Sequence, residues 1–360
     1  MQTEVVKQEI SCMDAEVLRR AGEVIRRGGL VAFPTETVYG LGGDALNPES
    51  SRKIYAAKGR PSDNPLIVHI CEMEDLDAIV SFVPQAAYRL AEAFWPGPLT
   101  MVLPKGEAVP YETTGGLDTV AVRMPSHEIA RAFIREAGGY VAAPSANLSG
   151  RPSPTLARFV VEDMDGRIDM IIDGGDIPIG LESTIVDLTG DVPMILRPGY
   201  ITGEMLAAVL GKVETDPTIL DGNSKERPKA PGMRYRHYAP RGSMLIVEGS
   251  GRSVVKEINR RIEQDRAAGL RTGVLATREN VDLFGADVVK CMGSRENEEE
   301  IANSLYRCLR EMDDENVERI YSESFSTNGI GQAIMNRLLK AAGHEIMTIE
   351  EDASDDSIGK

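Results

Sequence analysis

The sequence predicts an α/β protein with two domains: an N-terminal domain on an open, twisted, mixed α/β sheet and a smaller, doubly wound C-terminal domain. Three observations favour this fold class. The length of 360 residues exceeds one average domain. Short β-rich runs alternate with helical patterns, which is typical of an α/β sheet rather than a sandwich. Residues 216–242 are rich in Pro, Gly and basic residues without any sustained period, which indicates a basic linker.

In the N-terminal domain, residues 1–215, the first expected elements are a helix and a short strand. Asp14 can cap a helix whose apolar stripe runs from Ala15 to Ile25. A strand over 30–33 then leads into a loop dense in Thr and Gly, PTETVYGLGGDA. Further strands are expected in PLIVHI, LTMVLP, TVAVRMP, YVAAPSAN, MIIDGG and TIVDLTG, and helices near 50–58, 84–94, 126–137 and 155–163.

The C-terminal domain, residues 243–345, alternates strands and helices more regularly. Strands are expected in SMLIVEG, TGVLAT, DVVKCM and VERIYSE, and helices near 251–268, 296–312 and 328–342, with one short helix besides. Four βα units in succession predict a small Rossmann-like α/β domain. The tail, 346–360, is acidic and low in large apolar side chains, so we expect it to be frayed.

Charge and composition exclude several classes of protein. The net charge of -16 argues against a passive binder of polyanions. Residues 1–215 carry 19 Lys and Arg against 30 Asp and Glu, whereas the linker carries 6 against 3. We expect no secretion signal and no membrane span, because no apolar run is long enough. The four cysteines have no metal-binding spacing, so we expect reduced thiols in a cytoplasmic protein and no metal site.

The usual motifs for nucleotide binding and hydrolysis are missing from the sequence. It contains no GxxxxGK[ST], HExxH or GxSxG, and GLGGDA and GIGQAI fall short of GxGxxG. A nucleotide would therefore have to be held by a different arrangement.

Six polar clusters stand at the ends of apolar strands between residues 33 and 200, where ligands bind in open α/β sheets. Lys58 and Arg60 flank a glycine and offer a point charge beside a planar fork, which suits phosphate oxygens. Arg123 interrupts an apolar strand and could either clamp a carboxylate or pair with an acid. Taken alone, the Thr-rich segment is better explained as a turn and the Lys-Gly-Arg segment as a solvated loop, while the two roles of Arg123 are evenly balanced. Together they indicate a site for anionic ligands. The clusters are Thr35 to Tyr39, Lys58 to His69, Arg123, Ser145 to Ser153, Ser183 with Thr184, and Arg197.

These motifs closely resemble those of the threonylcarbamoyl-AMP synthase family over residues 14–210: PTETVYGLG, KGRPSDNPLIVH, FWPGPLT, VAVRMP, PSANLSG, ESTIVD and RPGYI. The linker sequence APGMRYRHYAP and the ending NGIGQAIMNRLLKAA resemble the long, two-domain branch of that family. The resemblance implies a nucleotidyltransferase that makes L-threonylcarbamoyladenylate from L-threonine, bicarbonate and ATP and releases pyrophosphate. It also implies a product used for N6-threonylcarbamoyladenosine in tRNAs reading codons that begin with adenosine, through a downstream tRNA threonylcarbamoyl transferase machinery.

The resemblance further implies a role for each matching residue. L-threonine would contact Thr37, His69, Arg123, Ala143 and Ser183, with Arg123 on its carboxylate. ATP would contact Arg60, Asn64, Thr119, Ser145, Ser153, Arg197, Arg236, His237 and Tyr238. Lys58 and Arg60 would be catalytic, with Lys58 holding bicarbonate or the carbamate near the α-phosphate. Mg²⁺ would accompany ATP without an evident side-chain ligand, and no protein-bound organic cofactor is expected.

We expect the linker, 216–242, to fold over the ATP polyphosphate as a lid through Arg234, Arg236, His237 and Tyr238, although a simple tether is the alternative. The C-terminal domain shows no chemical cluster, so we expect it to anchor the linker or bind a partner. Two other functions stay open. A carbamoyl-transfer module of the hydrogenase-maturation type would need Cys-rich fingers, and the sequence has no CxxC. An RNA-binding protein would need interleaved basic and aromatic residues, although a transient tRNA contact stays open.

Overall fold

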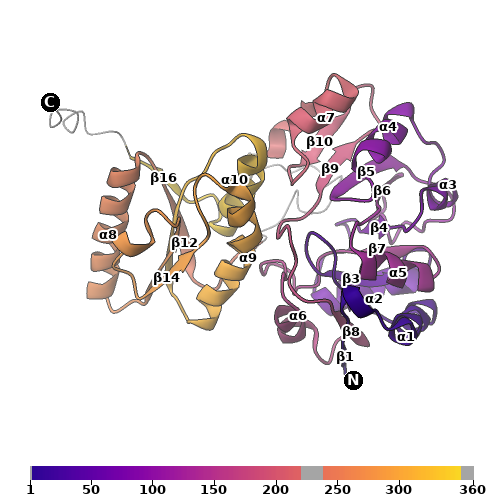
Figure 1. Ribbon diagram of the computed structural model, residues 1–360, viewed down its shortest axis with the longest axis horizontal. Coiled ribbons are helices and arrows are strands. Elements are labelled where there is room, and N and C mark those ends of the chain that lie inside the picture. Colours follow the sequence, from indigo (N-terminus) through magenta and orange to yellow (C-terminus); the bar gives the residue numbers. More distant parts are fainter. Residues whose placement is uncertain (1, 220–237, 350–360) are drawn as a thin grey trace.

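The computed structural model describes residues 2–219 and 238–349. Their strands form two sheets, one of eleven strands and one of five. The two sheets and their helices make two bodies that lie side by side, with α9 (Glu298–Asp314) and α10 (Gly329–Ala341) on the side of the second body that faces the first (Figure 1). The predicted fold class, a mixed open sheet followed by a smaller α/β domain, is confirmed.

The larger sheet mixes parallel and antiparallel neighbours in the order β1-β8-β2-β3-β7-β4-β6-β5-β9-β10-β11. Its strands are β1 (Glu4–Lys7), β2 (Val31–Phe33), β3 (Gly40–Asp44), β4 (Ile67–His69), β5 (Leu99–Pro104), β6 (Thr119–Arg123), β7 (Val141–Ala143), β8 (Met170–Asp173), β9 (Thr184–Asp187), β10 (Met194–Arg197) and β11 (Glu214–Thr215). Every residue of β2, β4 and β7 is buried. Strands buried on both faces read as apolar runs rather than alternating ones, which is the pattern in this sequence.

Seven α-helices accompany the larger sheet in the described residues: α1 (Ala15–Arg26), α2 (Pro48–Lys58), α3 (Leu76–Ile79), α4 (Gln85–Phe94), α5 (Glu128–Glu136), α6 (Ala157–Met164) and α7 (Gly203–Leu210). Asp14 caps α1 as predicted, its side chain accepting from the amide of Glu16. Helix α2 ends at Gly59, whose φ of 62° lies in the left-handed region that favours glycine. This end turns the chain between Lys58 and Arg60, so both cations leave the same sharp turn.

The smaller sheet is parallel throughout, in the order β14-β13-β15-β12-β16. Its strands are β12 (Ser243–Glu248), β13 (Thr272–Ala276), β14 (Val288–Cys291), β15 (Arg319–Glu323) and β16 (Ile346–Thr348). Helix α8 (Gly251–Ala267) covers one face, and α9 and α10 cover the other (Figure 1). Parallel strands joined by helices on both faces make a doubly wound domain. Short 3-10 turns occupy Ile10–Cys12, Met73–Asp75, Pro217–Ile219 and Val281–Leu283.

Two expectations drawn from the sequence are wrong. The Gly-rich segment expected as a loop contains β3, which pairs antiparallel with β2 and β7. Its glycines allow this close packing, because a Cβ on Gly42 would lie 2.8 Å from a methyl carbon of Val141. The tail expected to be frayed from residue 346 begins with β16, which pairs with β12. Strands β1 and β10 and helix α7 were not predicted either.

Within residues 2–219 and 238–349, every helix is too short or too polar to serve as a transmembrane span.

Candidate functional site

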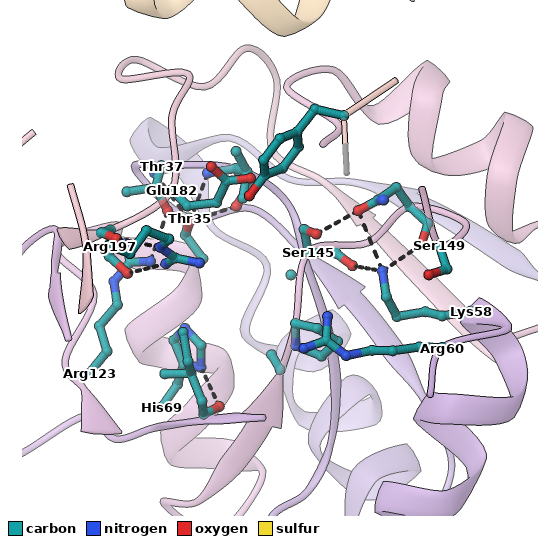
Figure 2. A pocket seen from close by; sticks show the side chains of 18 of the residues that line it. Thr35, Thr37, Lys58, Arg60, His69, Arg123, Ser145, Ser149, Glu182 and Arg197 are labelled. Atoms are coloured by element: carbon teal, nitrogen blue, oxygen red, sulfur yellow. Dashed lines mark hydrogen bonds between the residues drawn. The ribbon is translucent and has the colours of Figure 1, made fainter. Parts of the chain in front are cut away.

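A single pocket brings together residues from all six polar clusters (Figure 2). It leaves about 690 Å³ of space not filled by protein atoms, open solvent included. The residues that line it are Thr35, Thr37, Val38, Gly40, Lys58, Arg60, Ile67, His69, Arg123, Ala143, Pro144, Ser145, Asn147, Ser149, Gly150, Glu182, Ser183, Arg197 and Tyr238.

Sheet topology explains why residues so far apart in the sequence meet. Strands β4 and β6 are parallel neighbours, and their last residues, His69 and Arg123, are register partners. Strand β7 runs antiparallel on the other side of β4, which sets Ala143 opposite Ile67. In β10, Arg197 lies opposite Ile185 of β9.

Arg123 is almost fully buried and pairs with an acid inside the pocket wall. Its Nη1 donates to the hydroxyl of Thr37 at 2.8 Å. Its Nη2 lies 2.8 Å from Oε1 of Glu36, but the N–H is not aimed at that oxygen, so the contact is an ion pair without a hydrogen bond. Burial is the largest influence on the pKa of Glu36 and acts to raise it, but the charge of Arg123 and the N–H groups around the carboxylate together outweigh burial, so that pKa lies below its ordinary value. Arg123 therefore pairs with an acid and also faces the ligand space.

His69 is held as a neutral ring. Its Nδ1 lies 3.1 Å from the carbonyl oxygen of Ile67, and since a carbonyl can only accept, Nδ1 carries the hydrogen. Burial, together with the charge of Arg123, lowers the pKa of His69 to about 3. At neutral pH its Nε2 is therefore a hydrogen-bond acceptor in the pocket wall.

Lys58 and Arg60 lie on the opposite side of the pocket from Arg123 (Figure 2). Nζ of Lys58 donates to the carbonyl oxygens of Ser145 and Asn147, both at 2.5 Å. Burial and the neighbouring charge of Arg60 lower the pKa of Lys58 well below its ordinary value. The half-buried Arg60 donates to the carbonyl oxygen of Pro65 at 3.0 Å, and burial lowers its pKa to about 10, so it stays charged at neutral pH.

Arg197 and Ser183 form a further part of the wall. The guanidinium donates to the backbone carbonyl of Ser183 at 3.0 Å and to its hydroxyl at 3.1 Å. The same hydroxyl lies 2.7 Å from the hydroxyl of Thr100. Burial lowers the pKa of Arg197. Residues from β5 and β10, the two strands that pair with β9, thus fix the orientation of the serine that directly precedes β9.

Glu182 joins the pocket to the C-terminal domain, a contact that sequence reasoning missed. Its carboxylate accepts hydrogen bonds from the hydroxyls of Ser153 at 2.6 Å and Tyr306 at 2.8 Å, and from Nε of Arg337 at 3.1 Å. Burial acts to raise the pKa of Glu182, but Arg337 and Arg197 hold it at about 2. The motif ESTIVD, in which Glu182 directly precedes Ser183, could have marked this acid as a site residue, but it does not indicate its partners in the C-terminal domain.

Tyr238, at the described end of the linker, also reaches the pocket. It is buried, and its ring centroid lies 5.1 Å from that of Tyr306 on α9. The amide of the next residue, Ala239, donates to the carbonyl of Gly150 at 2.9 Å. Arg234, Arg236 and His237, which the sequence also assigned to the lid, lie outside the described residues.

The structure brings together most of the site residues predicted from the sequence. All five assigned to threonine line the pocket: Thr37, His69, Arg123, Ala143 and Ser183. Of those assigned to ATP, Arg60, Ser145, Arg197 and Tyr238 line it. Three others do not. The hydroxyl of Ser153 donates to the carboxylate of Glu182. Asn64 is buried, and its backbone carbonyl accepts a hydrogen bond from Arg60. Thr119 lies at the opposite end of β6 from Arg123. Thr35, Asn147, Ser149 and Gly150 line the pocket without a predicted role.

No group of three or more His, Cys, Asp or Glu side chains suited to a metal occurs in residues 2–219 and 238–349. Glu182 is the one acid among the described residues that line the pocket, and hydrogen-bond donors already occupy its oxygens. A metal ion there would have to depend on the oxygens of its ligand.

Comparisons with known proteins agree with this fold and site. Residues 23–199 match the family described as "Telomere recombination", and residues 201–343 match the family described as "Threonylcarbamoyl-AMP synthase, C-terminal domain". The threonylcarbamoyl-AMP synthases of Bacillus subtilis and Pyrococcus abyssi are each 48% identical, over 95% and 92% of this chain and 97% and 96% of their own lengths. A crystal structure of P. abyssi Sua5 complexed with L-threonine superimposes with a TM-score of 0.92 at 46% identity, covering 97% of this chain and 100% of that one.

A buried, cation-lined pocket at the strand ends of an open α/β sheet defines an enzyme site for anionic ligands. The sequence identity to known proteins over nearly the whole length of the chain identifies its family. The chain belongs to the threonylcarbamoyl-AMP synthase family and is an enzyme of the nucleotidyl-transferring class.

Proposed function

We propose that this enzyme makes L-threonylcarbamoyladenylate from L-threonine, bicarbonate and ATP. The threonine amine would add to bicarbonate with loss of water, giving a carbamate. A carbamate oxygen would then attack the α-phosphorus of ATP, and the new P–O bond would form as the bond to the leaving pyrophosphate breaks. The attacking group is already an anion, so this second step needs no strong general base. The site has to hold two anions together and balance the developing charge.

The observation that carries the proposal is the placement of cations on two sides of one pocket. Arg123 and Arg197 lie on one side, and Lys58 and Arg60 lie on the other (Figure 2). Two anions bound face to face would each meet cations and be separated only by the reacting atoms. Such an arrangement favours reaction by approximation and charge neutralisation rather than by a protein nucleophile.

Threonine fits the side of Arg123. The guanidinium would take the carboxylate, for which its planar fork is suited. The neutral His69 would accept a hydrogen bond from threonine through Nε2, and Ser183 and Thr37 would offer hydroxyls. Ala143 is 2% exposed and contributes a small apolar contact that suits a methyl group. The structure of P. abyssi Sua5 complexed with L-threonine supports threonine as a substrate.

ATP fits the side of Lys58 and Arg60, where Ser145 and Tyr238 would add contacts, and Arg197 would contact it from the side of Arg123. Lys58 would hold bicarbonate or the carbamate beside the α-phosphate. Mg²⁺ would come with ATP and be held through the phosphate oxygens, since the oxygens of Glu182 are already occupied. When bound, the ion would neutralise charge on the leaving pyrophosphate. We propose that the product passes to a tRNA threonylcarbamoyl transferase.

Pyrophosphate release by the purified full-length chain tests this function. With ATP and Mg²⁺ present, we expect release that requires both L-threonine and bicarbonate and that fails with L-serine at the same concentration. Release without threonine would reduce the chain to an ATP-hydrolysing relative. No release under any condition, together with a salt-dependent shift of labelled tRNA, would favour RNA binding instead.

A further inference from the structure

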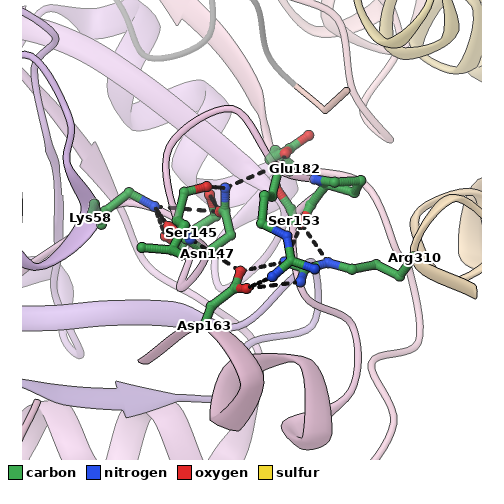
Figure 3. A network of polar contacts seen from close by, with 10 residues as sticks. Lys58, Ser145, Asn147, Ser153, Asp163, Glu182 and Arg310 are labelled. Carbon is green, nitrogen blue, oxygen red and sulfur yellow. Dashed lines mark hydrogen bonds and ion pairs between the residues drawn. The ribbon is translucent and has the colours of Figure 1, made fainter. Parts of the chain in front are cut away.

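A buried arginine of the C-terminal domain donates hydrogen bonds to the N-terminal domain next to the loop that lines the pocket. Arg310, on α9, is 1% exposed. It donates to both carboxylate oxygens of Asp163 on α6, at 3.2 and 2.7 Å, and to the backbone carbonyl of Pro152 at 3.0 and 2.6 Å (Figure 3). Two acceptors on different segments thus share one rigid, five-donor fork.

Asp163 also accepts hydrogen bonds from the pocket loop, residues 145–153. The side chain of Asp163 has no exposure to solvent. Besides Arg310 it accepts a hydrogen bond from the amide of Leu148 at 3.1 Å and from the guanidinium of Arg151. One carboxylate therefore ties α9 of the second domain to two points of the loop, while Arg310 holds a third point at Pro152.

The other side of the same loop holds Lys58. The carbonyl oxygens of Ser145 and Asn147 accept from its Nζ, and the amide of Ser149 donates to its backbone carbonyl at 2.9 Å. The side-chain amide of Asn147 spans the turn by donating to the carbonyls of Leu148 and Arg151, at 2.8 and 2.9 Å. Hydrogen bonds thus run without a break from Arg310 through the loop to the ammonium group of Lys58 (Figure 3).

We propose that Arg310 is a positioning residue: it fixes the pocket loop so that the carbonyls of Ser145 and Asn147 hold Lys58 at the reacting centre. The role in turnover rests on the proposed function. A buried arginine–carboxylate pair adds little net stability compared with a well-packed apolar replacement. Such a pair does fix the orientation of the groups it joins, because the planar guanidinium places two donors on each acceptor at a fixed angle. The C-terminal domain is on this account part of the catalytic apparatus.

Three full-length variants test the proposal. Arg310→Met removes the fork and leaves Asp163 partly unpaired. The double variant Asp163→Asn/Arg310→Met removes the stranded charge as well, so that stability recovers while the loop stays unanchored. Arg158→Met is the matched control, since it removes an exposed ion pair across the same domain boundary, to Asp314 and Glu311, without touching the pocket loop.

Two readouts are needed, kcat with KM for pyrophosphate release and the rate at which Lys58 is acetylated by an amine-reactive reagent, followed by mass spectrometry. In Arg310→Met and in the double variant we expect kcat to fall about tenfold and Lys58 labelling to rise about tenfold, as expected for the loss of one charged hydrogen-bond set. KM for threonine should change less than kcat, because Arg123 and Ser183 lie on the other side. Arg158→Met should change neither readout.

A double variant that regains thermal stability together with wild-type kcat and wild-type labelling would overturn the proposal and make Arg310 merely structural. So would equal effects in Arg158→Met. If the wild-type chain releases no pyrophosphate, the proposed function fails, but Lys58 labelling in the same variants still decides whether Arg310 fixes the loop. Raised labelling would support the positioning, and unchanged labelling would refute it.

Discussion

At the scale of single residues, the charged side chains that line the pocket have their partners within the pocket wall. Arg123 is an example, because a buried guanidinium on an apolar strand is tolerated only with compensation. Glu36 supplies the opposite charge and Thr37 an acceptor, and neither takes all the donors of the fork. The sequence left open whether Arg123 pairs with an acid or clamps a carboxylate, and the geometry allows both.

The role of Arg123 can be tested in a background that avoids a stranded carboxylate. We expect Glu36→Gln/Arg123→Ala to raise the threonine requirement roughly 100-fold, the size expected for losing a charge-assisted pair. Titration calorimetry should find ATP affinity within a few-fold of wild type. Glu36→Gln alone is the control and should keep threonine binding within a few-fold. Equal losses for both ligands in the double variant would indicate misfolding rather than a lost contact.

His69 makes stability depend on pH in a predictable direction. Its pKa is about 3 in the folded chain, against an ordinary value near 6.5. Between these values the unfolded chain binds a proton that the folded chain does not, so this contribution is complete above about pH 6.5 and is lost as pH falls.

We therefore expect that lowering the pH from 7.5 to 5.5 reduces the free energy of unfolding of the wild type by about 1 kcal/mol more than that of His69→Gln, which cannot titrate there. Urea unfolding at the two pH values measures this difference. Identical pH dependence in both proteins would mean that the ring is not held neutral.

The structure brings most of the charged and hydroxyl residues predicted for the site into one pocket, because their motifs stand at strand ends. Which residues face the pocket depends on tertiary packing that a local motif does not contain. Thr119 and Arg123 share β6, yet only Arg123 is at the end that meets the pocket. Glu182 gained its place through Tyr306 and Arg337, more than a hundred residues away, and no local pattern reports such a contact.

At the scale of elements, the segment 177–180 is pressed between the pocket and α9. Asn303 on α9 donates through its side chain to the carbonyls of Ile177 and Pro178, at 2.7 and 2.8 Å. The amide of Gly180 donates to the carbonyl of Thr37 at 3.1 Å. A Cβ on Gly180 would lie 2.5 Å from Cα of Asn303, so only glycine allows the helix to approach this closely.

Gly180→Ala should therefore disturb the domain contact. We expect a loss of about 3 kcal/mol in the free energy of unfolding, from overpacking against α9 and from a φ of +84°. Gly175→Ala is the matched control, since its φ is +82° but a Cβ there would meet nothing within 4 Å, and it should cost only about 1 kcal/mol. Chemical unfolding of both variants measures the difference. Similar losses would assign the effect to backbone strain alone.

Periodicity predicted most helices and the apolar strands, and caps such as Asp14 marked where helices begin. Strand β3 was missed because its glycines carry no β propensity, and it is a strand only through its pairing with β2 and β7. Strand β16 was missed because an acidic tail follows it, whereas its pairing with β12 decides its structure. Both failures are cases in which tertiary pairing outweighs local pattern.

At the scale of the whole molecule, the two domains share buried ion pairs in addition to the exposed pairs of Arg158. Arg337 and Arg310 each have a fully buried guanidinium that contacts the N-terminal domain, at Glu182 and at Asp163. Sequence analysis did not predict these pairs, because it found no chemical cluster in the C-terminal domain. The two arginines lie on α9 and α10 within ordinary helical patterns, and only docking of the domains reveals their partners.

The measurement that tests the central claim most directly is mass spectrometry of the product formed by the full-length chain from ATP, L-threonine and ¹³C-bicarbonate with Mg²⁺. We predict a nucleotide with the mass of threonylcarbamoyladenylate that becomes one mass unit heavier with the labelled bicarbonate and disappears when threonine is omitted. Conversion of ATP without any threonine-dependent, bicarbonate-labelled adenylate would contradict the account.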